Sequence, residues 1–290
     1  MDTAASARTG KGAGDENFPV ASWLISACHR PAILAFYDFV RTADDVADHP
    51  TLAPSEKIRL LDQLETGLIG NGSAEAVALP LRSVLDERNI TPQHALDLLA
   101  AFRVDIHKTR YENWDELIDY CRLSAMPVGR YVLDVHGESQ ALWPANDALC
   151  AALQIINHLQ DCAKDYRVLD RVYVPLDAMK SAGTNVGELA SDIASPALRR
   201  CLSDIALKVE QLLDEAGSFS WDIRDRRLSL EVAVIHGLAD RLVHLLQRRD
   251  PLSERVHIGK LGAFSVLIGV LARRMRGNPR RVGSAVRLSI

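Results

Sequence analysis

Apolar residues recur with the period of an α-helix along almost the whole chain. One example is the set Ile33, Tyr37 and Val40, whose spacing by three or four residues places them on one side of a helix. The same spacing recurs in segments 31–46, 56–68, 92–106, 114–136, 146–166, 196–213, 229–247 and 260–275. Alternating apolar and polar runs, which are typical of half-buried strands, are scarce. The sequence therefore predicts an all-α fold.

The breaks between these segments are short, and no fixed-length repeat is evident. They fall at 70–72, 137–144, 171–187 and 250–251. None is long or biased enough to be a linker between domains, and a hydrophobic content of 48% is enough to build one large core. We therefore expect a disordered segment over residues 1–15, one helical domain over 16–276 and a basic tail over 277–290.

Two prolines predict local features of these helices. Pro92 is expected at the first helical position of its segment, with Thr91 as the N-cap. Pro127 lies inside the run 114–136, where it removes a backbone N–H and predicts a kink beside Tyr120. Such a bend can serve the site or only the packing.

Charge and cysteine content exclude several classes of protein. The chain has 34 Lys and Arg against 38 Asp and Glu, a net charge of −4 that argues against nucleic-acid binding. Its 5 cysteines form no Cys-x-x-Cys pair, so a disulfide framework or a zinc site is not expected. Neither a secretory signal nor an apolar run of about 18 residues occurs, and we expect a cytoplasmic protein.

Acidic residues follow one side of the first predicted helix. Asp44 or Asp45 and then Asp48 continue a stripe that begins with Tyr37 and Arg41, at steps of three or four residues. Like charges at this spacing repel one another, and a bound cation reverses the penalty. A single pair of acidic residues at this spacing most often belongs to a solvated helix end, so a second observation is needed to predict a metal site.

The second observation is a matching stripe on a strongly apolar helix. Gln154, Asn157, Asp161 and Asp165 follow one another at steps of three or four residues. Carboxylates on a buried helix are costly unless they are paired or bind metal, and oxygen ligands suit Mg²⁺. Two such helices facing each other would hold a diphosphate through metal ions. The predicted Mg²⁺ ligands are Asp44, Asp45, Asp48, Asn157, Asp161 and Asp165.

At these residues the chain resembles the squalene/phytoene synthase family. The family motif Tyr-x-x-x-Arg-x-x-Asp-x-x-x-Asp matches Tyr37 to Asp48, and Gln-x-x-Asn-x-x-x-Asp-x-x-x-Asp matches Gln154 to Asp165. A Tyr-Cys…Val-Gly element begins at Tyr120, and the likeness covers about residues 16–265. The resemblance implies an isoprenoid synthase helical bundle around a central active-site cavity, with catalytic roles for Tyr37, Tyr120, Asp44 and Asp161.

Three short sequence segments resemble one branch of this family. Segments 16–22, 124–130 and 157–162 are similar to those of the branch that converts presqualene diphosphate and water to hydroxysqualene and diphosphate in bacterial hopanoid biosynthesis. The resemblance implies a carbon–oxygen lyase that requires Mg²⁺ and no nicotinamide cofactor. The substrate-binding residues it implies are Asn17, Phe18, Arg41, Gln154, Gln160, Arg255 and Lys260.

Gln160 is the most informative departure from the family pattern. Squalene and phytoene synthases usually carry Arg there, and losing that charge favours a site for one diphosphate rather than two. Two alternatives stay open: a head-to-head prenyl synthase that makes presqualene diphosphate, squalene or phytoene, and a non-catalytic scaffold on the same fold. His158 follows Asn157 directly, so we expect it to point away from the acidic face. Asp105 is expected to cap a helix or form a salt bridge.

The C-terminal segment is strongly basic. From residue 251 on, the chain has eight Lys and Arg against the single acid Glu254, beside the apolar run 261–271. Contact with anionic lipid on the inner face of the membrane is one interpretation, and a solvated tail is the simpler one. Transient contact with other enzymes of the squalene pathway is a further expectation.

Overall fold

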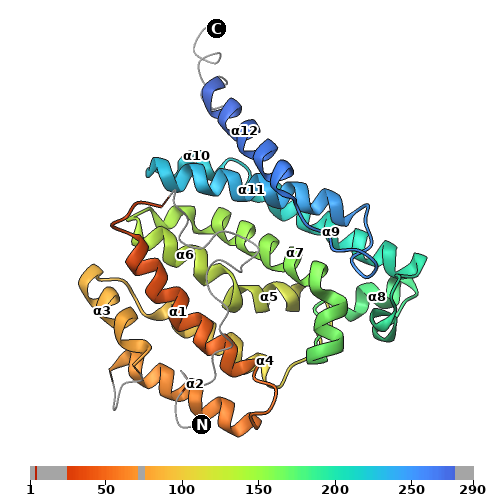
Figure 1. Ribbon diagram of the computed structural model, residues 1–290, viewed down its shortest axis with the longest axis horizontal. Helices are drawn as coiled ribbons and strands as arrows, with labels where there is room; N and C mark the ends of the chain where they lie inside the picture. Colours follow the sequence, from red (N-terminus) through yellow and green to blue (C-terminus); the bar gives the residue numbers. More distant parts are fainter. Residues whose placement is uncertain (1–3, 5–24, 71–75, 278–290) are drawn as a thin grey trace.

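A computed structural model describes Ala4 and residues 25–70 and 76–277, and these parts of the chain are built from helices (Figure 1). The helices are α1 (Arg30–Ala47), α2 (Pro54–Ile69), α3 (Ala78–Arg88), α4 (Gln93–Asp105), α5 (Trp114–Ser124), α6 (Met126–Val135), η2 (Gln140–Leu142), α7 (Trp143–Leu169), α8 (Leu176–Ala182), η3 (Val186–Ala190), α9 (Pro196–Ala216), α10 (Phe219–Asp222), α11 (Arg226–Leu246) and α12 (Lys260–Arg276). Extended pairing within the described ranges is limited to a bridge between Arg110 and Val172. The all-α prediction is therefore confirmed.

Several helices begin where the sequence supplies a cap. Ser195 accepts a hydrogen bond from the backbone N–H of Leu198 at 3.2 Å, and a proline opens α9. The Asp225 carboxylate accepts from two backbone N–H groups at the start of α11. Such caps satisfy donors that a helix leaves free at its first turn.

The run 114–136 is not one helix. Helix α5 ends at Ser124 and α6 begins at Met126, with Pro127 in the first turn of α6. A proline ring fits the first turn of a helix but would clash in its interior, so the break confirms the expected interruption. Thr91 is one position off as a cap, because Pro92 itself is the N-cap of α4.

Three α-helices lie outside the predicted segments: α3, α8 and α10, of which α10 spans only 4 residues. Helix α3 was missed because it has only a weak apolar stripe, and it buries three residues. Helix α8 lies within the predicted break 171–187 and is too short to show a clear period.

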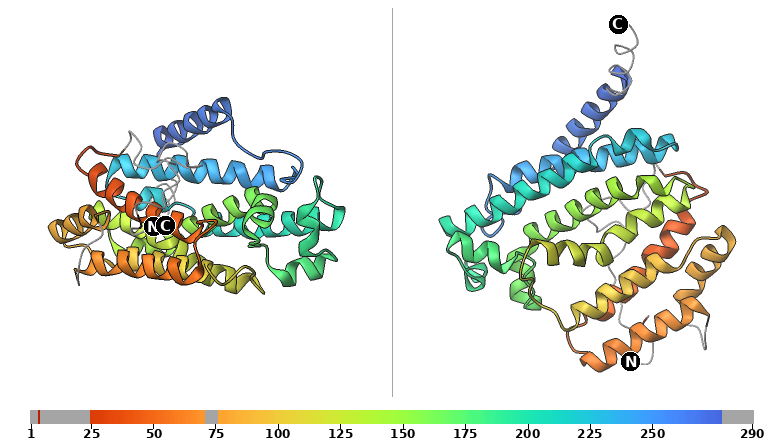
Figure 2. Two further views of the ribbon diagram at one scale, coloured as in Figure 1. Left: turned by 60° about the horizontal axis from the view of Figure 1, so that its bottom comes forward. Right: turned by 180° about the vertical axis from the view of Figure 1, so that it is seen from behind.

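The helices surround two hydrophobic cores. One core unites α1 to α4, and the other unites α5 with α7, α9 and α11. Helix α6 belongs to both, since Tyr131 packs in the first core and Leu133 in the second. Figures 1 and 2 show this order, with α1 to α4 on one side, α5 and α6 in the middle, and α7, α9 and α11 on the other.

Tyr131 fastens α6 to α1. Its ring stacks on Phe36 at a centroid distance of 4.0 Å, and its hydroxyl donates a hydrogen bond to the Ala32 carbonyl at 2.9 Å. The two cores are therefore held together at one end while a cavity opens between them.

Helix α12 follows α11 after the segment 247–259, packs on α11, and projects beyond the body of the molecule at its C-terminal end (Figure 1). Within residues 25–70 and 76–277, none of the helices combines the length and apolar character that a bilayer crossing requires.

Candidate active site

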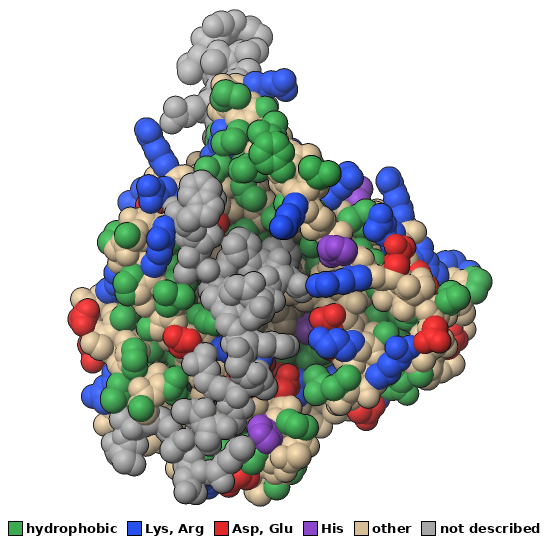
Figure 3. Space-filling view, viewed as in Figure 1, with side chains coloured by type: hydrophobic (Ala, Val, Ile, Leu, Met, Phe, Trp, Pro, Cys, Tyr) green, Lys and Arg blue, Asp and Glu red, His purple; other side chains and the backbone are tan. Residues whose placement is uncertain are grey.

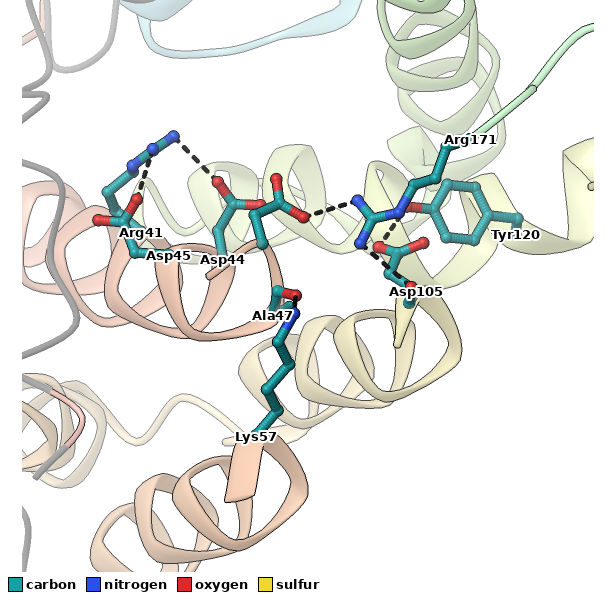
Figure 4. Close-up of polar contacts among 9 residues, drawn as sticks. Arg41, Asp44, Asp45, Ala47, Lys57, Asp105, Tyr120 and Arg171 are labelled. Atoms are coloured by element: carbon teal, nitrogen blue, oxygen red, sulfur yellow. Dashed lines mark hydrogen bonds and ion pairs between the residues drawn. The ribbon is translucent and has the colours of Figure 1, made fainter. Parts of the chain in front are cut away.

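The acidic stripe on α1 is organised by arginines. We call Arg41, Asp44, Asp45 and Asp48 the α1 face. The Arg41 guanidinium lies 2.9 Å from the Asp44 carboxylate and 2.6 Å from that of Asp45 (Figure 4). Asp44, Asp48 and Arg41 line the cavity. Asp45, one residue on from Asp44, is buried and lies outside the cavity lining, where it contacts Arg41.

Asp48 is held by an arginine from far along the chain. Arg171, at the end of α7, donates a hydrogen bond to the Asp48 carboxylate at 2.6 Å and another to the backbone carbonyl of Asp105 at 3.1 Å. The Tyr120 hydroxyl donates to the Asp105 carboxylate at 2.8 Å. Figure 4 shows this chain of contacts from α1 to Arg171, Asp105 and Tyr120.

The second acidic stripe lies on α7. We call Gln154, Asn157, Asp161 and Asp165 the α7 face. Gln154, Asn157 and Asp165 line the same cavity as the α1 face. Asp161 is 45% exposed and lies 3.9 Å from Lys164, outside the cavity lining.

One carboxylate on each face resists ionisation. Burial and the neighbouring Asp48 carboxylate raise the pKa of Asp44 to about 7. Burial and the neighbouring Asp161 carboxylate raise the pKa of Asp165 to about 7. The two faces therefore bring negative charge together at a site that disfavours it.

The cavity has a volume of about 550 Å³, and its lining changes from polar to apolar. The α1 and α7 faces, without Asp45 and Asp161, make the polar end together with Arg171. Tyr37 and Tyr120, the two predicted catalytic tyrosines, also line it. Apolar side chains line much of the rest, among them Phe36, Val40, Leu98, Phe102, Leu149, Leu153, Phe219, Leu228, Val232 and Ile235. Such a space can hold a long hydrocarbon with an anionic head.

A family model described as squalene/phytoene synthase matches residues 12–262, which is most of the chain. The chain belongs to the squalene/phytoene synthase family.

Three members of the family illustrate how close the likeness is. A hydroxysqualene synthase from Rhodopseudomonas palustris is 53% identical over 281 residues, covering 96% of each chain. The hydroxysqualene synthase from Sinorhizobium fredii is 53% identical over 276 residues, covering 94% of each. The crystal structure of squalene synthase HpnC from Alicyclobacillus acidocaldarius matches with a TM-score of 0.72 at 28% identity, covering 84% of this chain and 92% of that one. This squalene/phytoene synthase is therefore an isoprenoid synthase acting on a diphosphate, with the isoprenoid synthase helical fold.

The residues of the two faces fit the Mg²⁺ that the family implies. Asp44, Asp48, Asn157 and Asp165 offer hard oxygen donors to one cavity. Burial and a neighbouring carboxylate raise the pKa values of Asp44 and Asp165, and a bound divalent cation would offset both effects.

Not every predicted substrate contact lies at the cavity. Arg255 and Lys260 are exposed and outside its lining, and Gln160 is also outside it. The Gln160 amide instead donates a hydrogen bond to the backbone carbonyl of Val256 at 2.5 Å, which ties the segment before α12 to α7. Asn17 and Phe18 lie outside the described residues, as does nearly all of the predicted 1–15 and 277–290.

His158 does not point away from the cavity, contrary to the expectation. It lines the cavity, stacks on Tyr173 at a centroid distance of 3.5 Å, and shares a hydrogen bond with Gln154 at 3.1 Å. Burial, helped by the charge of Arg171, lowers its pKa to about 3. His158 is therefore a neutral hydrogen-bonding group in the cavity wall.

Arg171 was missed because it belongs to no helical stripe. It follows the end of α7, and the backbone pairing of segment 172–177 with segment 109–112 places it beside Asp48. His158 had a usable signal, since it lies four residues after Gln154. Asp105 was expected to form a cap or salt bridge, and its carboxylate instead accepts from Tyr120.

Proposed function

We propose that this protein is a hydroxysqualene synthase that converts presqualene diphosphate and water to hydroxysqualene and diphosphate. The observation that supports the proposal best is one cavity with two carboxylate faces at its polar end and an apolar remainder. Hydroxysqualene synthases with 53% identity over nearly the whole chain support the same choice within the family.

The polar end has the groups to bind a diphosphate. Asp44, Asp48, Asn157 and Asp165 would hold Mg²⁺, which neutralises charge on the leaving diphosphate when it is bound. Arg41 and Arg171 line the same end and keep Asp44 and Asp48 in place. We assign Asp45 to positioning Arg41, since its carboxylate contacts that guanidinium outside the cavity.

The apolar remainder protects a carbocation. Departure of diphosphate leaves a cyclopropylcarbinyl cation that bulk water would quench, so the wall has to exclude solvent. Tyr37, Tyr120 and Phe36 line the cavity and present aromatic faces of the kind that stabilise cations. Burial raises the pKa of Tyr120 well above its usual value, so its hydroxyl stays protonated and bonded to Asp105.

Glu231 is our candidate for placing the attacking water. It is 3% exposed, on α11, and lines the cavity beside Leu228 and Val232. A carboxylate there can accept a hydrogen bond from one water molecule. As the water oxygen bonds to the cationic carbon, the carboxylate takes its proton, and the product is an alcohol without any reductant.

We also propose partners and a cellular location for this enzyme. The substrate and product are long hydrocarbons that enzymes before and after this one must deliver and remove. We therefore propose transient contact with other squalene-pathway enzymes on the cytoplasmic side of the inner membrane. NADPH has no part in this reaction.

A product assay tests the function directly. Presqualene diphosphate and farnesyl diphosphate are offered separately, with Mg²⁺, in ¹⁸O-labelled water and without NADPH. A C30 alcohol carrying ¹⁸O is expected from presqualene diphosphate, and little or nothing from farnesyl diphosphate. Efficient conversion of farnesyl diphosphate to presqualene diphosphate or a hydrocarbon would mean a head-to-head synthase, and no turnover of either substrate would favour a scaffold.

The Glu231→Gln variant tests the water assignment within the same assay. The amide cannot accept a proton, so the share of alcohol should fall and the share of elimination hydrocarbons should rise. Glu210→Gln on α9 is the matched control, because Glu210 is not among the cavity-lining residues. An unchanged product ratio in Glu231→Gln would contradict the assignment.

A further inference from the structure

Helix α12 is firmly docked along one side. Val270 is buried, and a Cβ added to Gly237 of α11 would lie 2.8 Å from Val266, so the two helices approach closely. Arg274 donates hydrogen bonds to the backbone carbonyls of Ser220 at 3.1 Å and Ser229 at 2.9 Å. The position of α12 on the body is therefore defined by its packing.

The opposite side of α12 is apolar and exposed. Leu261, Phe264, Ile268, Leu271 and Met275, which we call the α12 stripe, follow one another at steps of three or four residues. Their exposed fractions are 87%, 62%, 50%, 38% and 83%. Figure 3 shows hydrophobic side chains gathered on the helix that projects at the top of the view. A helix with two apolar sides normally has both of them covered, and a contiguous exposed patch marks a binding surface.

The charges around the stripe indicate what covers it. Helix α12 has no acidic residue, and Lys260, Arg273 and Arg276 are exposed on it. The sequence continues past the described part with three further arginines at positions 280, 281 and 287. An apolar stripe bordered by cations matches the interface of an anionic membrane, where hydrocarbon and negative head groups lie together.

A second copy of the chain fits this surface less well. Two α12 stripes packed against each other would bring their basic borders together, and like charges at an interface oppose association. Lipid offers the opposite charge. If the proposed function holds, lipid also surrounds the C30 substrate.

We propose that the α12 stripe docks the enzyme on anionic phospholipid, with α12 lying in the plane of the interface. The stripe contributes the apolar contact and the surrounding Lys and Arg the electrostatic attraction. The cavity between the two cores is then held beside the membrane while the active site stays in the protein body.

Vesicle cosedimentation of the full-length protein tests the proposal. Binding is expected to vesicles that contain phosphatidylglycerol, to weaken as salt is added, and to be much lower with phosphatidylcholine alone. The double variant Phe264→Ser/Ile268→Ser should lower the partition coefficient at least about tenfold. Leu207→Ser is the matched control, because Leu207 is 48% exposed on another helix, α9.

Three results would overturn the docking proposal. These are equal vesicle binding by the double variant and the native protein, no binding by the native protein, and self-association that the double variant abolishes in analytical ultracentrifugation. Both substituted side chains are exposed, so the melting temperature of the double variant should be unchanged. Vesicle binding requires no turnover, so its failure is distinguishable from failure of the proposed reaction.

Discussion

The two acidic faces of the cavity differ in how the protein itself balances their charge. On the α1 face, each carboxylate contacts an arginine: Arg41 pairs with Asp44 and Asp45, and Arg171 pairs with Asp48. On the α7 face, Lys164 makes a loose 3.9 Å contact with Asp161. Among the described residues, no lysine or arginine lies within ion-pair distance of Asp165.

The α1 face is therefore preorganised by the protein, whereas the α7 face depends more on a bound cation to balance its charge. The arginines fix the α1 carboxylates in geometry before anything binds, at the cost of removing Arg171 from water. The pKa values of Asp44 and Asp165 are both raised to about 7, but Asp44 already contacts Arg41, whereas Asp165 has no such contact among the described residues. We therefore expect metal and diphosphate to stabilise the α7 face more than the α1 face.

Removing the metal should have the largest effect. EDTA is expected to abolish turnover, and added Mg²⁺ to restore it, because the loose contact of Lys164 with Asp161 is the only ion pair of the α7 face among the described residues. Mg²⁺ with pyrophosphate should also raise the melting temperature, since both bind only the folded state. Full activity in EDTA-treated, metal-free protein would refute the assignment.

Asp165→Asn should be the most damaging single change on the α7 face. We expect activity to fall by at least about 100-fold, since the amide lacks the negative charge and one of the two oxygen donors of the carboxylate. The metal-free variant should nevertheless melt about 2–5 °C higher than the native protein, because like-charge repulsion is relieved. Asp44→Asn should likewise lose activity without unfolding.

The stability gain of Asp165→Asn should depend on pH. The folded pKa of Asp165 is raised to about 7 from an ordinary 3.8, so the stability of the native protein falls as pH rises through this interval. The gain should therefore be small at pH 4, grow up to about pH 7 and then level off. Thermal melts of both proteins in EDTA measure it, and a pH-independent gain would contradict the shift.

Asp48→Asn should have the opposite effect on stability. It leaves the buried guanidinium of Arg171 without its carboxylate, so the metal-free protein should lose about 1–2 kcal/mol, a modest value because Asp48 is 37% exposed. The double variant Asp48→Asn/Arg171→Met should recover part of the loss. If Asp48→Asn and Asp165→Asn shift the melting temperature in the same direction, the two faces do not differ as described.

Gln160→Ala should have the smallest effect. The variant loses the hydrogen bond to the Val256 carbonyl and loosens the segment that leads to α12, so we expect KM to rise about threefold with little change in kcat. Gln247→Ala is a suitable control, because its amide bonds Glu210 on the surface side of the helices. A large fall in kcat would place Gln160 closer to the chemistry than its contacts indicate.

Helical spacing was enough to predict that Asp44 and Asp48, and likewise Gln154, Asn157 and Asp165, share a side of their helices, because residues at steps of three and four do so. The spacing could not show how broad a band of each helix surface lines the cavity. On α7 the lining includes Cys150, Gln154 and His158 as well as Asn157, a band broad enough to include the histidine expected to point away. Asp45, one residue from Asp44, falls on the neighbouring side and outside the lining.

Contacts between distant segments were beyond the reach of the sequence. Arg171 reaches Asp48 only because the chain after α7 pairs with the segment before α5, through a bridge that neither segment signals by itself. The break between α5 and α6 was predictable from Pro127, since proline disrupts a helix interior through its own ring and missing N–H, whatever the rest of the chain does. Local sequence rules were therefore enough to predict most of the helices, whereas tertiary contacts determine which charged side chains form ion pairs.

The contact between Tyr131 and α1 has a consequence for the way the molecule opens. The Tyr131 hydroxyl bonds the Ala32 carbonyl and its ring stacks on Phe36, so α6 cannot leave α1 without breaking both contacts. Residues of α1 and α6 should therefore form one cooperative unit, and their amide hydrogens should exchange with solvent at matched rates, although they are separated by about 100 positions in the sequence. Tyr131→Phe keeps the ring but removes the hydroxyl, and it should speed exchange in both helices together.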